Sequence, residues 1–493
     1  MKTKYWLPLT LVIVFGLIIR LINFGSNPSS LYWDEVAIGL DARSLIQTGR
    51  DINGNQWLQP LFKSYGDYKA PVYILATTIL AKFLGFSETI IRLPSLLAFI
   101  GLSISLFFLV KLIFPTKKLM PLLSVFTLSI MPWSYHFSRI GMESHLSLFF
   151  LTASIYLLIK GLTDKKILII IISALTLSLG IYSYIVLRII GPILFLITFF
   201  LYKSKDQKLN LKIIIINLII IATSITVLTK SNFYQQSQNY RLSNDNLLTS
   251  TTNINSSIKS IEATSNSIIN RAIYHRYFYK AKEYTSNYFE YFSPKFLLTK
   301  GDPNLRHHSG YGGELLLIQG LFLIIGLFYL NTINLKPKLL LISWIILSPS
   351  IAALVNETPH ASRAIYLMVP LTILIALGIN QSIKLTKSKH LLSPLILLLI
   401  LIINSSLFLY DYHKFYPDRS KLDWIQPYTK IFKHFKNNPS PKSIYITSKY
   451  YQPGLYARFY LSNYDNFSFN LPDTCPSDAI CISTENWESI INN

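Results

Sequence analysis

The chain has 493 residues, of which 51% are hydrophobic and only 14% carry a charge. About a quarter of the residues in a soluble protein of this length are charged, so the composition excludes an ordinary soluble enzyme. The formal net charge of +22 could suit nucleic acid. However, much of the lysine excess lies in short loops between apolar runs. That distribution is typical of cytoplasmic loops in membrane proteins and argues against nucleic-acid binding.

Apolar runs of about 20 residues recur along the chain, and a run of that length crosses the hydrocarbon core of a bilayer. We therefore predict an all-α polytopic membrane protein with about 11 transmembrane helices. The predicted spans are 6–24, 91–113, 118–135, 145–162, 166–182, 185–202, 212–229, 313–331, 338–355, 364–383 and 391–410. The first span is interpreted as a retained signal anchor, because it is too long for a signal-peptide core and lacks a cleavage site.

The apolar run at 71–85 is short for a crossing and contains Lys82. The charges of the loops indicate whether this run crosses the membrane. If this run does not cross and the N-terminus is cytoplasmic, five lysine-rich loops lie on the cytoplasmic side, as the positive-inside rule requires. These loops are 115–118, 163–166, 203–208, 335–338 and 384–389. We therefore predict an interfacial or re-entrant helix at 71–85 and an extracytoplasmic C-terminus, in a multi-pass protein of the cell (plasma or inner) membrane.

The long external segment 230–312 has two parts with different compositions. Residues 231–270 are rich in Ser, Asn, Thr and Gln, which predicts an extended or partly disordered loop. Residues 271–300 are aromatic and basic, which predicts an amphipathic interfacial helix. The opposite face of the membrane has no loop of comparable length.

The tail 411–493 loses the long apolar runs of the transmembrane domain 1–410. Strand-like stretches at 443–447 and 455–461 predict a small extracytoplasmic α+β domain. The only two cysteines of the chain, Cys475 and Cys481, lie in this tail. They would form a disulfide in an oxidising compartment, and two free thiols are the alternative.

The first external loop begins with adjacent carboxylates, Asp34 and Glu35. Acidic residues close to a bilayer are costly, which makes the pair a candidate site. Repulsion between neighbouring carboxylates favours a raised pKa on one of them, and that group could act as a general base. Alternatively, the two carboxylates could bind a divalent cation, Mg²⁺ or Mn²⁺. Lys69, in the same loop, is either a cation for a phosphate leaving group or an interfacial lysine.

Further charged residues lie at the external ends of later spans. Arg92 lies at the mouth of the second span, and Arg139 and Glu143 flank the outer ends of the third and fourth. Arg139 and Glu143 could instead form a structural i,i+4 pair. Two basic clusters precede later spans, and their members are Arg306, His307 and His308, and His360 and Arg363. Side chains of these types bind phosphates or sugar hydroxyls, although helix capping or a zinc site are alternatives.

The arrangement of these residues resembles the membrane-embedded GT-C glycosyltransferases, in particular bacterial relatives of protein O-mannosyltransferases and lipid A aminoarabinose transferases. The matching positions are Asp34-Glu35, Lys69-Ala70-Pro71, Ile91-Arg92-Leu93-Pro94-Ser95, Ser138-Arg139 with Glu143, and Pro359-His360 with Arg363. The resemblance extends over residues 1–410 and is strongest in the first 145 residues. Many relatives have Lys-Pro-Pro where this chain has Lys69-Ala70-Pro71, a difference that affects the expected acceptor more than the reaction.

The resemblance implies an inverting enzyme that transfers a hexose or pentose from a polyprenyl-phosphate donor to a protein, lipid or glycan hydroxyl on the external face. Asp34 and Glu35 would be catalytic. Lys69, Arg92 and Arg139 would hold the donor phosphate, and the remaining basic residues and Glu143 would contact substrate. No cofactor is implied with certainty beyond the divalent cation named above. The alternatives are an O-antigen polymerase or ligase, and a flippase or transporter of lipid-linked sugars.

Overall fold

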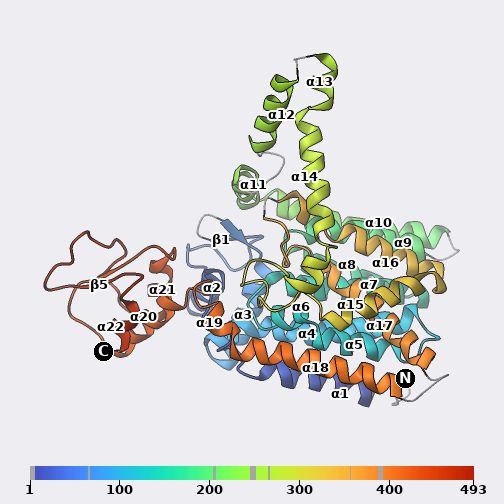
Figure 1. The fold of residues 1–493 in the computed structure, drawn as a ribbon, viewed down its shortest axis with the longest axis horizontal. Helices are drawn as coiled ribbons and strands as arrows, with labels where there is room; N and C mark the ends of the chain where they lie inside the picture. The colour runs from blue at the N-terminus through green and yellow to red at the C-terminus, as the bar shows by residue number, and fades with distance from the viewer. Residues whose placement is uncertain are drawn as a thin grey trace.

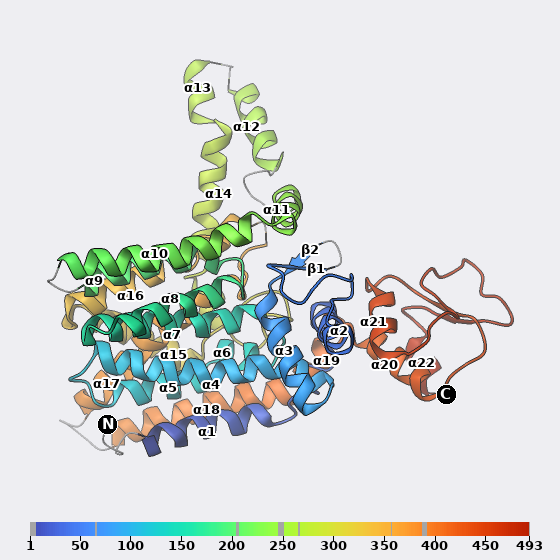
Figure 2. The same cartoon turned by 180° about the vertical axis from the view of Figure 1, so that it is seen from behind.

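The computed structural model describes residues 6–64, 67–203, 207–244, 251–264, 267–355, 357–386 and 392–492. Long apolar helices lie side by side in a bundle, and smaller elements gather at one end of it (Figures 1 and 2). One apolar helix overlaps each of the predicted spans. These helices are α1 (Trp6–Leu21), α4 (Glu88–Ile113), α5 (Met120–Ile130), α7 (Glu143–Asp164), α8 (Ile167–Ile181), α9 (Leu187–Tyr202), α10 (Gln207–Thr229), α15 (Leu317–Phe328), α16 (Leu335–Leu347), α17 (Met368–Thr386) and α18 (Leu392–Lys414).

The predicted all-α membrane fold is confirmed, because the chain is mostly helical and its two sheets are small. Among the described residues, 5 helical stretches are both long and apolar enough to cross a membrane: Glu88–Ile113, Glu143–Asp164, Leu211–Thr229, Leu335–Leu354 and Ile365–Lys384. Several of the other bundle helices are apolar but shorter. The number of crossings stays a prediction.

Close helix crossings hold the bundle together. A Cβ added to Gly326 in α15 would collide with the carbonyl of Leu374 in α17, and one added to Gly378 would collide with the carbonyl of Phe322. Reciprocal glycines let two backbones approach closely, which is how helices pack in lipid, where no hydrophobic effect drives them together.

The loop predicted to be the first external loop forms the end of the bundle opposite the N-terminus (Figure 1). It contains α2 (Trp33–Thr48), an antiparallel hairpin of β1 (Phe62–Ser64) and β2 (Asp67–Lys69), and α3 (Pro71–Leu84). Pro71 starts α3, and Gly85, at φ +84°, follows its last residue. The 14 residues of α3 lie beside α2 at this end of the bundle (Figure 2), and whether this helix crosses the membrane stays a prediction.

The segment after α10 projects from the side of the bundle (Figure 1). Its described residues form α11 (Asn232–Asn244), α12 (Thr251–Ala263), α13 (Ile268–Ile273) and α14 (Arg276–Glu290), followed by one π-helical turn, η2 (Lys295–Thr299). The prediction of an extended or disordered loop at 231–270 is therefore wrong for the described part of that range. The isoleucines at 254, 258 and 261 follow helical spacing, and this apolar stripe lies within an otherwise polar composition.

The C-terminal region is the predicted small α+β unit. It contains α19 (Tyr416–Arg419), α20 (Gln426–Asn437), α21 (Pro453–Tyr460) and α22 (Trp487–Asn492), with a parallel sheet in the order β4 (Phe467–Ser468), β3 (Ile444–Ile446) and β5 (Ile480–Ile482). The strand predicted at 455–461 is wrong, because α21 occupies it. Pro453 at the first turn favours a helix start there.

Cys475 and Cys481 form a disulfide. Side chains of this C-terminal unit also hold it against the first external loop: the Tyr456 hydroxyl donates to the Leu31 carbonyl at 2.9 Å. From the other side, Arg43 of α2 donates to the carbonyls of Arg458 and Phe459.

Candidate active site

The start of α2 presents Asp34 to solvent. Tyr32 precedes the helix in an extended conformation, and its backbone N–H donates to the Glu35 carboxylate at 3.0 Å. A carboxylate that accepts from an otherwise unpaired N–H in the first turn stabilises the helix start. The side chain of Asp34 points away from this contact and is 52% exposed.

Lys69 lies beside Asp34. It ends β2, and its ammonium donates to the backbone carbonyl of Asp34 at 2.9 Å and lies 3.7 Å from the carboxylate oxygen Oδ1. Its side chain is only 8% exposed. The hairpin therefore fixes the Lys69 ammonium, which is largely shielded from water, next to the exposed carboxylate of Asp34. A negatively charged ligand could bind this ammonium.

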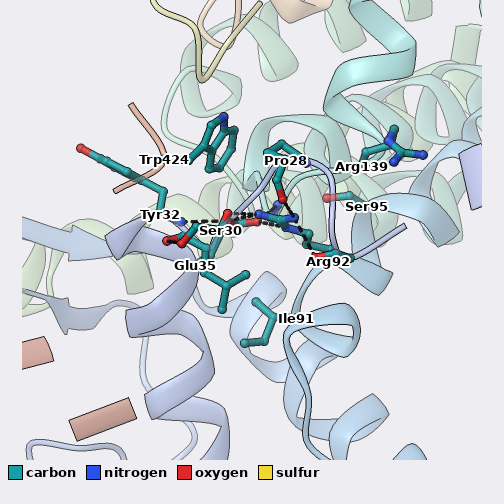
Figure 3. Close-up of polar contacts among 12 residues, drawn as sticks. Pro28, Ser30, Tyr32, Glu35, Ile91, Arg92, Ser95, Arg139 and Trp424 are labelled. Atoms are coloured by element: carbon teal, nitrogen blue, oxygen red, sulfur yellow. Dashed lines mark hydrogen bonds and ion pairs between the residues drawn. The ribbon is translucent and has the colours of Figure 1, made fainter. Parts of the chain in front are cut away.

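Glu35 and Arg92 form a buried ion pair behind this surface (Figure 3). Nε of Arg92 donates to Oε1 of Glu35 at 2.8 Å, and Nη2 donates to Oε2 at 2.9 Å. The remaining donors of Arg92 reach the carbonyls of Gly25, Pro28 and Ser30. All five N–H groups of this fully buried guanidinium therefore have partners, and none is left for a phosphate.

The Glu35 carboxylate is equally occupied. Besides Arg92 and Tyr32, it accepts the Gly141 backbone N–H at 2.7 Å. Its side chain is 3% exposed. This geometry does not favour the predicted role as a second catalytic carboxylate or a metal ligand, because four hydrogen bonds already use its oxygens.

Two further buried arginines fix α1 and the chain that follows it against residues 129–139. Arg139 donates to the carbonyls of Arg20, Asn23 and Asn27, and Arg20 donates to Ser138 at 2.7 Å and to the Ser129 carbonyl at 2.8 Å. Arg139 is fully buried. Its position favours a structural role over the predicted phosphate contact.

Arg139 and Glu143 do not share a continuous helix. The helix α6 (Pro132–Phe137) ends before Arg139, and α7 begins at Glu143. The i,i+4 helical pair considered from sequence therefore does not form as such. Glu143 is half-buried in the first turn of α7.

The two basic clusters meet beside α2. The guanidinium carbon of Arg306 lies 4.0 Å from the centre of the Tyr32 ring. His307 and His360 lie with their ring centres 4.3 Å apart. His308, by contrast, turns inward: it is 2% exposed, and burial lowers its pKa to about 4.

Asp302, His307 and His360 could hold a metal ion, since their ligand atoms all lie within 4.8 Å of one another. The Asp302 carboxylate lies 3.2 Å from Nδ1 of His307 and accepts the Ala361 N–H at 2.7 Å, which joins the two loops. Nδ1 of His360 is buried without a hydrogen-bond partner. Burial also lowers the pKa of His360, so its imidazole is neutral at pH 7, the form that binds metals.

Arg363 is half-buried, and its Nη1 is a buried donor without a hydrogen-bond partner. It follows His360 on the loop that meets Asp302. The structure thus brings Lys69 next to Asp34, Arg306 next to Tyr32, and His307 next to His360. It places Arg92, Arg139, Glu35 and His308 in the interior.

Asp41 is a candidate that the sequence prediction missed. It follows Asp34 by two turns of α2, is 1% exposed, and has Oδ2 without a hydrogen-bond partner. Burial raises its pKa to about 7, although the nearby charge of Lys69 opposes the rise. Its spacing from Asp34 on one helix face was the only signal in the sequence.

Comparisons with known proteins identify the fold. Residues 68–228 match the family described as dolichyl-phosphate-mannose-protein mannosyltransferase. Among curated proteins, no sequence matches the chain.

Solved structures of two proteins align over almost the whole chain. ArnT from Cupriavidus metallidurans bound to undecaprenyl phosphate is 10% identical, with a TM-score of 0.57, and the alignment covers 99% of this chain and 88% of ArnT. The oligosaccharyltransferase AglB from Archaeoglobus fulgidus, in complex with an inhibitory peptide and a dolichol-phosphate, is 14% identical, with a TM-score of 0.53 and 96% of this chain covered. This chain spans 61% of AglB.

These alignments confirm the predicted resemblance to the GT-C glycosyltransferases. The chain has the GT-C glycosyltransferase fold, and its residues 68–228 match the model of the dolichyl-phosphate-mannose-protein mannosyltransferase family.

Proposed function

We propose that this protein is an integral membrane glycosyltransferase that transfers a sugar from a polyprenyl-phosphate donor to an acceptor hydroxyl on the extracytoplasmic face. The observation that carries the proposal is the exposed carboxylate of Asp34 beside the shielded ammonium of Lys69. The undecaprenyl phosphate and dolichol-phosphate in the structures of ArnT and AglB support a lipid phosphate as the leaving group.

In the proposed reaction, Asp34 accepts the proton of the acceptor hydroxyl. The hydroxyl oxygen forms a bond to the anomeric carbon, and the bond between that carbon and the phosphate oxygen breaks. The bonding electrons leave with the lipid phosphate, whose added charge is stabilised by the cations of Lys69 and Arg306. A single displacement inverts the anomeric configuration.

Glu35, Arg92 and Arg139 are positioning residues in this proposal. Glu35 and Arg92 fix the first turn of α2, and Arg139 fixes the loop that enters it. His360 and Arg363 remain candidates for contact with the donor, because the loop that carries them joins the Asp302 loop beside Arg306.

Replacing the proposed base tests the function. Asp34→Asn keeps the shape of the side chain but removes the proton acceptor, so transfer should fall at least about 100-fold, the usual contribution of a general base. The assay uses purified protein, a panel of polyprenyl-phosphate sugars and mass spectrometry of the products.

Lys69→Ala should raise the KM for the donor in the same assay, because it removes the cation proposed to bind the lipid phosphate.

Asp465→Asn, an exposed carboxylate in the C-terminal unit, is the matched control and should leave turnover unchanged. Near-normal transfer by Asp34→Asn would rule out the base. Failure of wild-type protein with every donor in the panel would reject the glycosyltransferase proposal itself.

We further infer that any divalent cation binds at Asp302, His307 and His360 rather than at Asp34 and Glu35. Two imidazoles with one carboxylate suit Zn²⁺ or Mn²⁺ better than Mg²⁺, which prefers oxygen ligands. Metal analysis of purified protein should find about one ion per chain, lost in His307→Ala. A metal content that His307→Ala leaves unchanged would contradict this assignment.

A further inference from the structure

A small hollow lined by Trp33, the residue before Asp34, lies between the first external loop and the C-terminal unit. Its volume is about 250 Å³. Pockets for drug-sized ligands measure about 300–1,000 Å³, so this one suits a single small ring rather than a lipid tail or a folded partner. Four of its lining side chains are aromatic: Tyr32, Trp33, Tyr450 and Tyr451.

The aromatic rings come from two distant parts of the chain. Trp33 immediately precedes Asp34 and contacts Tyr451 edge to face, with ring centres 6.0 Å apart. Tyr32 lies 5.0 Å from Trp33 by the same measure. Aromatic faces pack against the apolar C–H face of a pyranose and leave its hydroxyls free for hydrogen bonds.

Charged side chains of both signs complete the lining: Arg306, Lys449 and Asp423. A carboxylate together with guanidinium and ammonium groups supplies both acceptors and donors, which is what a neutral ligand with many hydroxyls requires. Burial raises the pKa of Asp423, and the charge of Arg306 opposes that rise.

The backbone around the hollow is strained. Ile425 and Tyr451, both in the lining, have φ values of +52° and +60°. The left-handed conformation costs of order 1–3 kcal/mol per residue, and it is a true outlier for a β-branched residue. Such strain gathers at ligand sites, where it fixes a side chain in place. Here it presents the ring of Tyr451, which is 69% exposed, to Trp33.

We propose that this hollow binds a sugar residue of a glycan acceptor and so places the acceptor hydroxyl next to Asp34. This inference rests on the proposed glycosyltransferase function and names the class of its acceptor. The C-terminal unit then serves the reaction directly, because it contributes Tyr451 and Lys449 to the acceptor site.

Saturation-transfer NMR on the full-length protein in detergent tests the proposal. The probes are mannotriose, chitotriose, maltotriose and a galactose disaccharide, with a Ser/Thr-rich peptide as the competing class. At least one oligosaccharide should bind, with signals strongest on the C–H protons of one ring. Tyr451→Ala and Asp423→Asn should each weaken that binding at least tenfold. Tyr464→Ala, an aromatic control in the same unit but outside the hollow, should not change it.

Absence of binding for all four sugars, binding unaffected by both pocket variants, or binding of the peptide alone at this site would overturn the proposal. A second measurement separates the acceptor-site hypothesis from the proposed transfer reaction. It is the hydrolysis of the donor by wild-type protein without acceptor, followed as release of polyprenyl phosphate. Donor turnover without sugar binding rejects the acceptor site alone. Sugar binding without turnover of any donor rejects the proposed reaction.

Discussion

Asp34 and Glu35 are neighbours in the sequence, yet successive residues of a helix point in directions about 100° apart. One carboxylate therefore faces solvent beside Lys69, and the other faces the interior and pairs with Arg92. A buried pair of this kind is costly to break, because removing one partner leaves an uncompensated charge.

Replacing either member of this pair should destabilise the protein strongly. We expect Arg92→Ala and Glu35→Gln to lower the free energy of unfolding, with Arg92→Ala costing about 3–5 kcal/mol because Glu35 is left charged and buried. Thermal unfolding in detergent measures the loss. In the double variant Glu35→Gln/Arg92→Met the loss should be smaller than the sum of the two single losses. Two outcomes would contradict this role and favour a phosphate contact by Arg92: additive losses in the double variant, or an Arg92→Ala protein of normal stability with a raised KM for the donor.

Asp41 should make stability depend on pH. Its pKa is about 7 in the folded protein and about 3.9 for an unperturbed aspartate, so between these values the folded state binds an extra proton. The contribution is therefore fully present below about pH 4 and is lost as the pH rises through 7. Asp41→Asn should flatten the fall in Tm over this range. An identical pH profile in wild type and variant would show that Asp41 is not the titrating group.

The sequence predicted the residue types at the site better than their roles. Asp34 and Lys69 lie side by side, and His307 and His360 of the two basic clusters lie against each other. The roles of Glu35 and Arg92 could not be separated from that of Asp34, because hydrogen-bond satisfaction depends on the tertiary positions of Gly25, Pro28 and Gly141.

Among the elements, long apolar helices were predictable and short polar ones were not. The spans follow from hydropathy alone, since lipid requires every backbone group to be paired within the segment. The helices α11 and α12 lie in a polar stretch whose composition favours disorder. The sequence of α21 suggests a strand because Tyr and Phe are enriched in strands. Pro453 at the helix start and the packing of Phe459 against Gly39 of α2 favour the helix instead.

At the scale of the whole molecule, contacts between loops divide them into two groups, one at each end of the bundle. These groups are the lysine-rich loops and the loops predicted to be external. Lys117 and Lys384 are close enough to interact, and Lys336 lies over the ring of Tyr202. These contacts place the lysine-rich loops at one end of the bundle. At the other end, the Tyr184 hydroxyl lies 3.3 Å from that of Ser362. Loops that share an end of the bundle share a side of the membrane, so one labelled loop from each set fixes the topology.

Single cysteines provide that measurement, because both native cysteines are held in a disulfide. A membrane-impermeant maleimide applied to intact cells should label Leu58→Cys, whose native side chain is 74% exposed in the first external loop. Lys118→Cys, in a lysine-rich loop, should react only after the membrane is opened. Ser87→Cys follows α3 and should react from outside, because the lysine-rich loops obey the charge rule only if α3 does not cross. Protection of Ser87→Cys would mean that α3 crosses, and labelling of Lys118→Cys in intact cells would place the lysine-rich loops outside, against the charge rule that assigns Asp34 to the external face.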